Sequence, residues 1–231
     1  ITSALDLTTH ATGIIIPVYL PQNESYKLGS SLLEDTTRSF AEIVENPASI
    51  CLVVDGDENG RGITKNLHTS EGITAHGEGT NRGKLQGMIS GARLMLQNKY
   101  IKYLAVIDQD GDHFANELVN LVRMAEHITT QTGNDRVLVN GSRNSRHRPL
   151  GFLRGELEEL ADRVLLDMLH YRAVSRNRPL NLQFCMPLAE FPDFHSGYKL
   201  YSRPIAEAVF GSEPSLSGCS ENACYRHACE A

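Results

Sequence analysis

Apolar runs of strand length alternate with segments of helical periodicity along the first part of the chain. The runs Gly13–Val18, Ser49–Val54 and Tyr103–Ile107 are rich in isoleucine, valine and leucine, which is typical of buried strands. Between them, Tyr26–Val44 and Arg82–Asn98 carry apolar residues at helical spacing. Because each helix must return the chain to the start of the next strand, the alternation predicts an α/β fold. We expect a Rossmann-like, mostly parallel sheet with helices on both faces.

The remaining elements follow the same reasoning. They are a short helix at Ile63–Thr69, a strand at Gly72–Ala75, a helix at Phe114–Ile128, a strand at Val137–Asn140, and helices at Phe152–Tyr171, Pro204–Phe210 and Glu221–Ala231. No internal repeat or low-complexity linker divides the chain. We therefore expect one domain over residues 1–231, although the pattern changes after residue 140.

Composition limits the classes of function. The chain has 231 residues, of which 41% are hydrophobic and 22% charged, as in ordinary soluble globular proteins. The net charge of −6 gives no basic field that would favour nucleic acid, so no nucleic-acid partner is expected. No run approaches the roughly 20 apolar residues of a membrane span.

The C-terminal cysteines do not form a recognisable zinc site. Five-residue spacings between Cys219, Cys224 and Cys229 match no common zinc pattern, so reduced thiols are expected there.

Polar residues gather where the predicted strands end. Pro17 and Tyr19 lie at the end of the first strand, Asp55 follows the second, and Asp108 and Asp110 follow the strand at Tyr103–Ile107. Ligands of parallel α/β sheets bind beyond the carboxyl ends of the strands. The sequence therefore predicts one acidic, polar crevice at this edge.

The acidic stretches fit magnesium or manganese better than calcium. Starting at Asp55, an EF-hand pattern fits for six positions, but the twelfth position is Asn66 instead of the chelating glutamate. In the stretch IDQDGDH the glycine comes two positions early. Two carboxylates one residue apart at a strand end, Asp108 and Asp110, suit a Mg²⁺ or Mn²⁺ ion shared with a diphosphate. The alternative is a solvated turn in which Asp112 caps the following helix.

The segment NRGKLQG, Asn81 to Gly87, suits a diphosphate as well. Gly83 allows a close approach of the backbone, and Lys84 supplies a cation near a helix start. The segment is not a Walker A loop, which requires a different spacing of glycines before the lysine.

In order along the chain, six segments resemble motifs of the family 2 glycosyltransferases of the GT-A fold. They are GIIIPVYLPQNE, VVDGDENG, NRGKLQGMISGA, YLAVIDQDGDH, NGSR and DFHSGYKLYSR, which together span Gly13 to Arg203. The last two resemble the polyprenyl-phosphate mannose and glucose synthase branch most closely. Val54 departs from the family pattern, in which an aspartate precedes the equivalent of Asp55.

The resemblance implies an inverting, metal-dependent transfer of a hexose from a nucleotide diphosphate sugar to a polyprenyl phosphate or another acceptor. It implies that residues 1–140 bind the nucleotide sugar and residues 141–231 face the acceptor, with a C-terminal part expected to be missing. The nucleotide-sugar-binding residues implied by position are Pro17, Tyr19, Asp55, Asn81, Gly83, Lys84, Asp108, Gln109 and Asp110. Asp108 and Asp110 would hold the Mg²⁺ or Mn²⁺.

On the acceptor side the resemblance implies a general base, Asp193, for a hydroxyl acceptor. A phosphate acceptor is already ionised and needs no base. The residues implied to hold the acceptor are Arg143, Ser196, Gly197 and Lys199, with Arg146 and Arg148 nearby. A lipid-linked phosphate would place the protein in the cytoplasm, peripheral at the cytoplasmic membrane face, and the sequence predicts no oligomeric state.

Two other functions stay open. A nucleotidyltransferase would make nucleotide sugars from a nucleoside triphosphate, but its class carries a glycine-rich loop after the first strand, where this chain reads PVYLPQNES. A non-catalytic sugar-nucleotide-binding protein could share the fold, because a fold does not determine a function.

Overall fold

The structure is a computed structural model that describes residues 3–20, 26–56, 58–145, 147, 151–185, 191–212, 218 and 220. The chain forms two compact units. The first, here called the sheet unit, comprises residues 1–139 and 197–229, and the second, the α7 unit, comprises residues 140–196 and 230–231.

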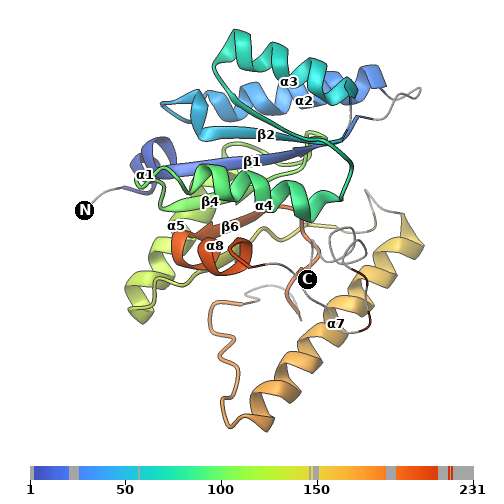
Figure 1. Ribbon diagram of the computed structural model, residues 1–231. Coiled ribbons are helices and arrows are strands. Elements are labelled where there is room, and N and C mark those ends of the chain that lie inside the picture. The colour runs from blue at the N-terminus through green and yellow to red at the C-terminus, as the bar shows by residue number, and fades with distance from the viewer. Residues whose placement is uncertain are drawn as a thin grey trace. The chain divides into compact units, whose positions relative to one another are not determined.

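The sheet has six strands in the order β3-β2-β1-β4-β6-β5 (Figure 1). Their bounds are β1 Thr12–Val18, β2 Ile50–Asp55, β3 Thr74–Glu78, β4 Tyr103–Val106, β5 Leu138–Asn140 and β6 Lys199–Ser202. β1 pairs in parallel with β2 and β4, β2 pairs in parallel with β3, and β6 runs antiparallel to β4. The carboxyl ends of β1 to β4 therefore lie at one edge of the sheet.

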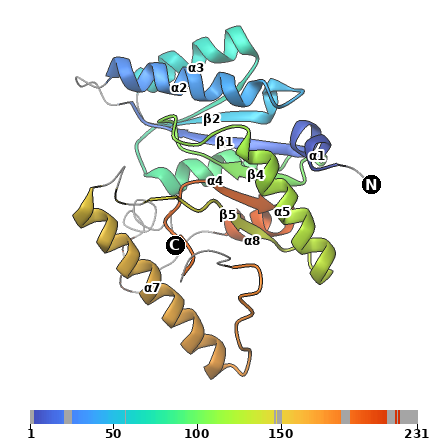
Figure 2. The same ribbon diagram turned by 180° about the vertical axis from the view of Figure 1, so that it is seen from behind.

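Helices cover both faces of this sheet, as the two opposite views show (Figures 1 and 2). The helices of the sheet unit are α1 Ala4–Ala11, α2 Tyr26–Ala41, α3 Glu58–Glu71, α4 Lys84–Met95, α5 Glu117–Thr132 and α8 Arg203–Phe210, and a 3₁₀ turn, η1, spans Pro47–Ser49. Side chains alternate along each strand between two cores. Ile14 and Ile16 pack with α1, α2, α3 and α5, whereas Ile15 packs with α4 and α8.

The predicted fold class, α/β with a mostly parallel sheet covered on both faces, is confirmed. The nine strands and helices that the sequence predicts before residue 141 are present, with α3 beginning five residues earlier than expected. The predicted helix at Glu221–Ala231 lies outside the described residues. α5 begins at Glu117 and its N-cap residue is Asn116, so Asp112 does not cap this helix.

Among the described residues, sequence reasoning missed the helix α1, the turn η1 and the strand β6. A capping box begins α1: the Ser3 side chain accepts a hydrogen bond from the Asp6 amide, and the Asp6 carboxylate accepts one from the Ser3 amide. β6 is only four residues long and starts with a lysine, so its own sequence does not indicate a strand. The strand forms because it pairs with β4, which sets Lys199 opposite Val106, and such a contact between distant residues cannot be predicted from a local pattern.

In the α7 unit, α7 runs from Phe152 to Ser175, which confirms the long helix predicted for this region. The large apolar side chains of α7 are mostly exposed: Leu153 keeps 73% and Met168 63% of its accessible surface. Only Gly155, Asp162 and Ala173 of this helix are buried. No helix in the described part of the chain combines the length and the apolar character needed to cross a membrane.

Candidate functional site

An ion pair between Lys84 and Asp108 lies at the carboxyl edge of the sheet. The Lys84 Nζ is 2.6 Å from the Asp108 Oδ1, and each side chain keeps about 30% of its surface exposed. Burial opposes ionisation of Asp108, but the charge and hydrogen bond of Lys84, helped by His113 and Lys199, outweigh it. The pKa of the Asp108 carboxyl is therefore below its usual value, and the group is a carboxylate at neutral pH.

The backbone before α4 is held by Asp55, the last residue of β2. Its carboxylate oxygens accept hydrogen bonds from the Arg82 amide at 2.7 Å and the Gly83 amide at 2.8 Å. Gly56 follows with a φ of 67°, and a Cβ there would overlap the backbone of Asn81. A glycine at residue 56 lets the two loops touch, and this contact fixes the start of α4, where Lys84 is the first residue.

A second bridge joins the ends of β1 and β4. The Tyr19 amide donates to the Gln109 Oε1 at 2.8 Å, and the Gln109 Nε2 donates to the Tyr19 carbonyl at 2.7 Å. Tyr19 as a whole residue is 51% exposed. This reciprocal pair fixes the backbone of an exposed tyrosine, on whose ring a planar base could stack.

The His113 ring contacts the backbone of Asp108, and the sequence did not predict this contact. The Asp108 amide donates to the His113 Nδ1 at 3.0 Å, so this nitrogen carries the lone pair. Burial is the main reason that the pKa of His113 is below its usual value, although the nearby carboxylates oppose this shift. The ring stacks on Tyr198 with centroids 4.8 Å apart. The only sequence signal was the position of His113 at the end of IDQDGDH.

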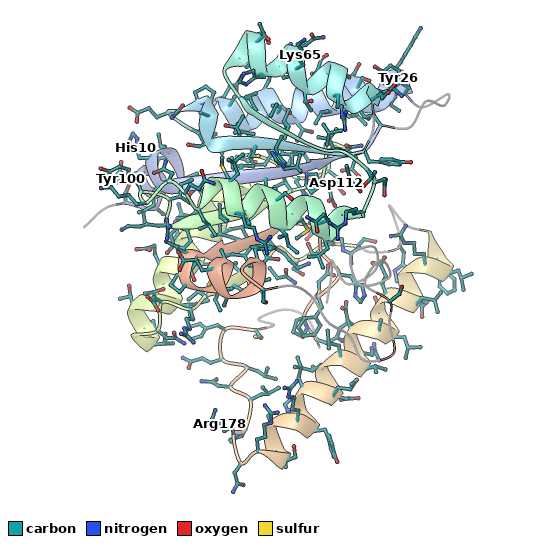
Figure 3. The ribbon with its side chains drawn as sticks, in the orientation of Figure 1. His10, Tyr26, Lys65, Tyr100, Asp112 and Arg178 are labelled. Carbon is teal, nitrogen blue, oxygen red and sulfur yellow. The ribbon has the colours of Figure 1, made fainter. Side chains whose placement is uncertain are left out.

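Asp110 and Asp112 are neighbouring carboxyl groups that act on each other. Desolvation, the neighbouring Asp110 side chain and the charge of Asp108 raise the pKa of Asp112 to about 7. Figure 3 shows Asp112 at the carboxyl edge, where its side chain is 59% exposed. Hard oxygen ligands such as carboxylates suit Mg²⁺ or Mn²⁺.

Within the described ranges, no three His, Cys, Asp or Glu side chains are grouped so that they could hold a metal ion. Protein sites for Mg²⁺ commonly supply only one or two carboxylates and take their other ligands from substrate phosphates and water. Asp108 and Asp110 stay the two carboxylates that the sequence predicts for such an ion.

Gly197 packs directly against Asp108. A Cβ on residue 197 would overlap the Asp108 Oδ2 and come within 3.1 Å of the His113 ring. Lys199, two residues further on, is 7% exposed, and its charge acts on Asp108. The structure thus brings Gly197 and Lys199, which the resemblance implied for the acceptor, to the carboxylate implied for the donor.

Replacement of Gly197 by alanine is expected to lower the free energy of unfolding by about 1–3 kcal/mol, because the new methyl group overpacks the Asp108 carboxylate. Urea denaturation measures the change. Gly62 in α3 is the matched control, since a Cβ there meets nothing within 4 Å. Gly62→Ala should be neutral or stabilising, and an equal loss in both variants would contradict the steric account.

In the α7 unit, Arg143 and Asp193 form a buried ion pair. The Arg143 Nε lies 2.8 Å from the Asp193 Oδ2, its Nη2 lies 2.7 Å from the Oδ1, and its amide also donates to the Oδ2 at 3.1 Å. The Asp193 side chain is 2% exposed. The hydrogen bonds that Arg143 donates to Asp193 raise the pKa of Arg143 further above its usual value. The contact of Arg143 with the partly buried Glu158 acts in the same direction. Sequence reasoning named Arg143 and Asp193 separately and did not predict that they pair.

A carboxylate and an imidazole, Asp162 and His195, meet in the same unit. The Asp162 Oδ1 lies 2.7 Å from the His195 Nδ1 and accepts the Phe194 amide at 3.1 Å. Neither residue was singled out from the sequence. Ser196 follows and is buried, and its amide donates to the Asp193 carbonyl at 3.3 Å.

The remaining predicted residues are placed as follows. Pro17 pairs with Val53 in the β1–β2 register and is partly buried, and Asn81 lies exposed on the loop that contacts Gly56. Arg146 and Arg148 lie outside the described residues.

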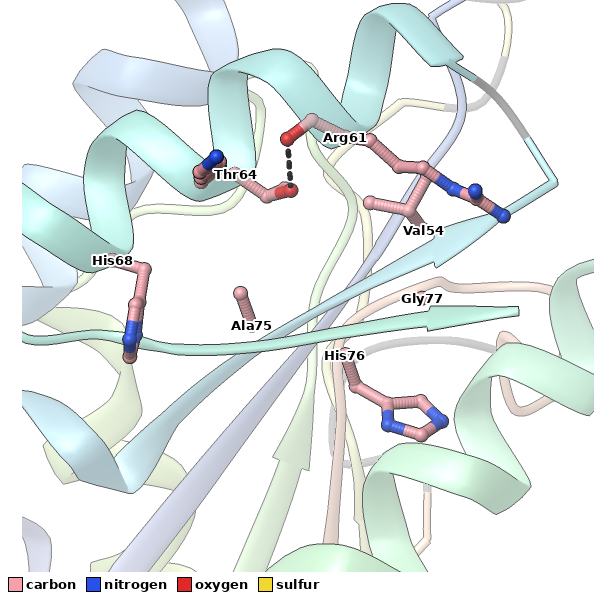
Figure 4. Close-up of a pocket in the computed structure, with 8 residues that line it drawn as sticks. Val54, Arg61, Thr64, His68, Ala75, His76 and Gly77 are labelled. Atoms are coloured by element: carbon pink, nitrogen blue, oxygen red, sulfur yellow. Dashed lines mark hydrogen bonds between the residues drawn. The ribbon is translucent and has the colours of Figure 1, made fainter. Parts of the chain in front are cut away.

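A cavity of about 160 Å³ lies elsewhere, between α3 and the edge strand β3 (Figure 4). Its lining residues are Val54, Arg61, Thr64, Lys65, His68, Ala75, His76 and Gly77. None of the predicted site residues lines it, so the candidate site rests on the side-chain contacts at the carboxyl edge and not on this cavity.

Comparisons with known proteins show no sequence relative: no protein-family model and no curated protein matches the chain. Among solved structures, residues 1–349 of S. aureus TarS align with a TM-score of 0.45 and 12% identity, over 93% of this chain and 53% of that one. A cytidylyltransferase from Leptospira borgpetersenii serovar Hardjo-bovis (strain JB197) aligns with a TM-score of 0.45 and 11% identity, over 95% of this chain and 69% of that one. This chain thus spans about half of the TarS structure. At these scores the likenesses carry no argument about function.

Proposed function

We propose that the chain is an inverting, metal-dependent glycosyltransferase that moves a hexose from a nucleotide diphosphate sugar to a polyprenyl phosphate or another acceptor. The observation that carries the proposal is the Lys84–Asp108 pair at the carboxyl edge, next to the loop held by Asp55. A cation and backbone amides can bind the phosphates of a diphosphate, and a carboxylate can bind its metal ion. The six motifs of the sequence give the order of these groups along the chain.

Each group has a role in this proposal. Tyr19 offers its ring to the nucleobase, and the loop at residues 81–83 lies beside the ribose and diphosphate. Lys84 exchanges part of its contact with Asp108 for a contact with the diphosphate, as a mobile ammonium group can. Asp108 and Asp110 would hold Mg²⁺ or Mn²⁺. Such an ion stabilises the charge that develops on a leaving nucleoside diphosphate.

The acceptor side belongs to the α7 unit in this proposal. Arg143 would hold an anionic group of the acceptor, and Asp193 was expected to act as the base. Its two oxygens already accept three hydrogen bonds from Arg143, so the basic role of Asp193 stays a prediction. A nucleotidyltransferase remains the second candidate, and release of pyrophosphate from a nucleoside triphosphate would favour it.

Asp110→Ala is expected to abolish metal-dependent binding of a nucleoside diphosphate, because it removes one of the paired carboxylates. Isothermal titration of wild type and variant with the nucleotide, in Mn²⁺ and in EDTA, measures the effect. Asp135→Ala removes an exposed aspartate outside the site and should bind as the wild type does. Equal affinity of wild type and Asp110→Ala in Mn²⁺ would remove Asp110 from the proposed site.

A further inference from the structure

The cavity between α3 and β3 lies beside an open edge of the sheet. β3 is the first strand in the sheet order, so one of its edges pairs with no other described strand. Its residues Ala75 and Gly77 are exposed. An unpaired strand edge presents backbone N–H and C=O groups to which a further strand can add. The cavity and this edge both belong to the sheet unit.

Three basic side chains of α3 line the cavity along β3. Arg61, Lys65 and His68 are exposed, and their spacing of four and three positions sets them on one face of the helix. The His68 Nδ1 donates to the Ile73 carbonyl at 2.6 Å, next to the start of β3. The Arg61 Nε lies 3.7 Å from the place that a Cβ on Gly77 would take, near the end of β3. These three residues, here called the basic row, therefore follow β3 over its length (Figure 4).

The floor of the cavity is made of small and apolar residues. Val54 of β2 and Ala75 and Gly77 of β3 line it, and they leave about 160 Å³ unfilled beneath α3. His76 points to the opposite side of β3 (Figure 4), as the alternation of side chains along a strand requires. A strand added at the edge would likewise direct every second side chain toward the basic row.

The spacing of the basic row suits such a strand. Helix positions four and three apart are separated by about 6 Å and 4.5 Å along the axis, and alternate side chains of a strand lie about 6.6 Å apart. The two acidic residues described on α3, Glu58 and Glu71, do not line the cavity, and Glu71 lies 3.6 Å from Arg38. The side chains that best complement the row are therefore carboxylates at every second position.

We propose that the edge of β3 binds an extended acidic segment of a partner protein, which adds to the sheet as a strand and directs alternate carboxylates to the basic row. Backbone hydrogen bonds supply the affinity in this mode of recognition, and the side-chain pattern supplies the specificity. A second copy of this chain fits less well. If two β3 edges paired in one continuous sheet with their α3 helices on the same face, the two basic rows would repel each other. The site shares no residue with the proposed nucleotide site and does not depend on it.

The first test measures binding of a labelled peptide, TEVEVEVT, to the whole chain by fluorescence anisotropy at low ionic strength. TKVKVKVT, with the same label, should not bind. Lys65→Glu should raise the Kd for TEVEVEVT about tenfold, because an attractive charge becomes a repulsive one. Lys102→Glu makes the same change of charge at an exposed lysine before β4 and should bind as the wild type does. Equal affinity for the two peptides, or equal effects of the two substitutions, would overturn the proposal.

The second test asks whether the peptide binds as a strand. Only every second amide of an added strand faces β3, so N-methylation of either the glutamate or the valine amides, and not of both sets, should raise the Kd about tenfold or more. Equal effects of the two methylated sets would contradict strand addition, and so would an absence of binding by the unmodified peptide.

Sedimentation velocity tests a second copy of the chain as the occupant. The proposal predicts that TEVEVEVT leaves the oligomeric state of the protein unchanged. A dimer that the peptide dissociates would assign the β3 edge to a second copy and overturn the proposal.

Discussion

Arg143→Ala is expected to lower the free energy of unfolding by about 3–5 kcal/mol, because it leaves the buried Asp193 carboxylate without its cation. Arg143 gives Asp193 two side-chain hydrogen bonds and also contacts Glu158 through its Nη1 at 2.9 Å. Taking both carboxylates out of water is tolerable only while the guanidinium compensates their charge. Urea denaturation followed by far-ultraviolet circular dichroism measures the loss.

Arg154 supplies the matched control. Its Nε contacts the same Glu158 at 3.1 Å, but its side chain is 67% exposed. An exposed pair contributes about 0–1 kcal/mol, so Arg154→Ala should change stability little. The account of the buried pair would be wrong if Arg143→Ala and Arg154→Ala lowered the free energy of unfolding by the same amount. Arg143→Met combined with Asp193→Leu should recover part of the loss, because it removes the Asp193 charge together with its cation and leaves Glu158 its contact with Arg154.

Asp55→Ala is expected to weaken both the fold and nucleotide binding. Its carboxylate is the acceptor for the buried Gly83 amide and the partly buried Arg82 amide. A buried amide left without an acceptor costs about 1–3 kcal/mol, and the loop before α4 would lose its anchor. Chemical denaturation measures the first effect and calorimetric titration with a nucleoside diphosphate and Mn²⁺ the second.

Asp55→Asn separates the two contributions, because the amide group keeps one acceptor oxygen in nearly the same shape. It should retain part of the stability that Asp55→Ala loses. A wild-type affinity for nucleotide in Asp55→Ala would show that the anchored loop does not shape the binding site.

The sequence was sufficient to predict much of the sheet and the position of Asp55 and Asp108 at its carboxyl edge. Runs such as Ser49–Val54 are apolar on both faces, so their burial in a parallel sheet follows from local composition. Because Asp55 and Asp108 come directly after such runs, their position at the carboxyl edge follows from the same pattern. These predictions needed no knowledge of distant contacts.

What the sequence did not predict depends on contacts between distant residues. Asp55 was expected to hold the nucleoside, but its oxygens accept amide hydrogens from residues 27 and 28 positions later. Gly197 was assigned to the acceptor, yet it packs against Asp108 because β6 pairs antiparallel with β4. The sequence around Asp162 in α7 does not distinguish it from other polar residues. Its partner His195 lies 33 positions further along the chain.

The most direct test of the proposed function is a thermal-shift measurement on the wild-type chain with UDP, GDP, ADP, CDP and dTDP, each in Mn²⁺ and in EDTA. A ligand that binds only the native state stabilises it by RT ln(1 + [L]/Kd), about 2.7 kcal/mol at a concentration of 100 Kd. We predict that one nucleotide raises the melting temperature in Mn²⁺ and loses this effect in EDTA. Stabilisation by Mn²⁺ alone, or no shift with any nucleotide, would contradict a metal-dependent nucleotide-sugar site.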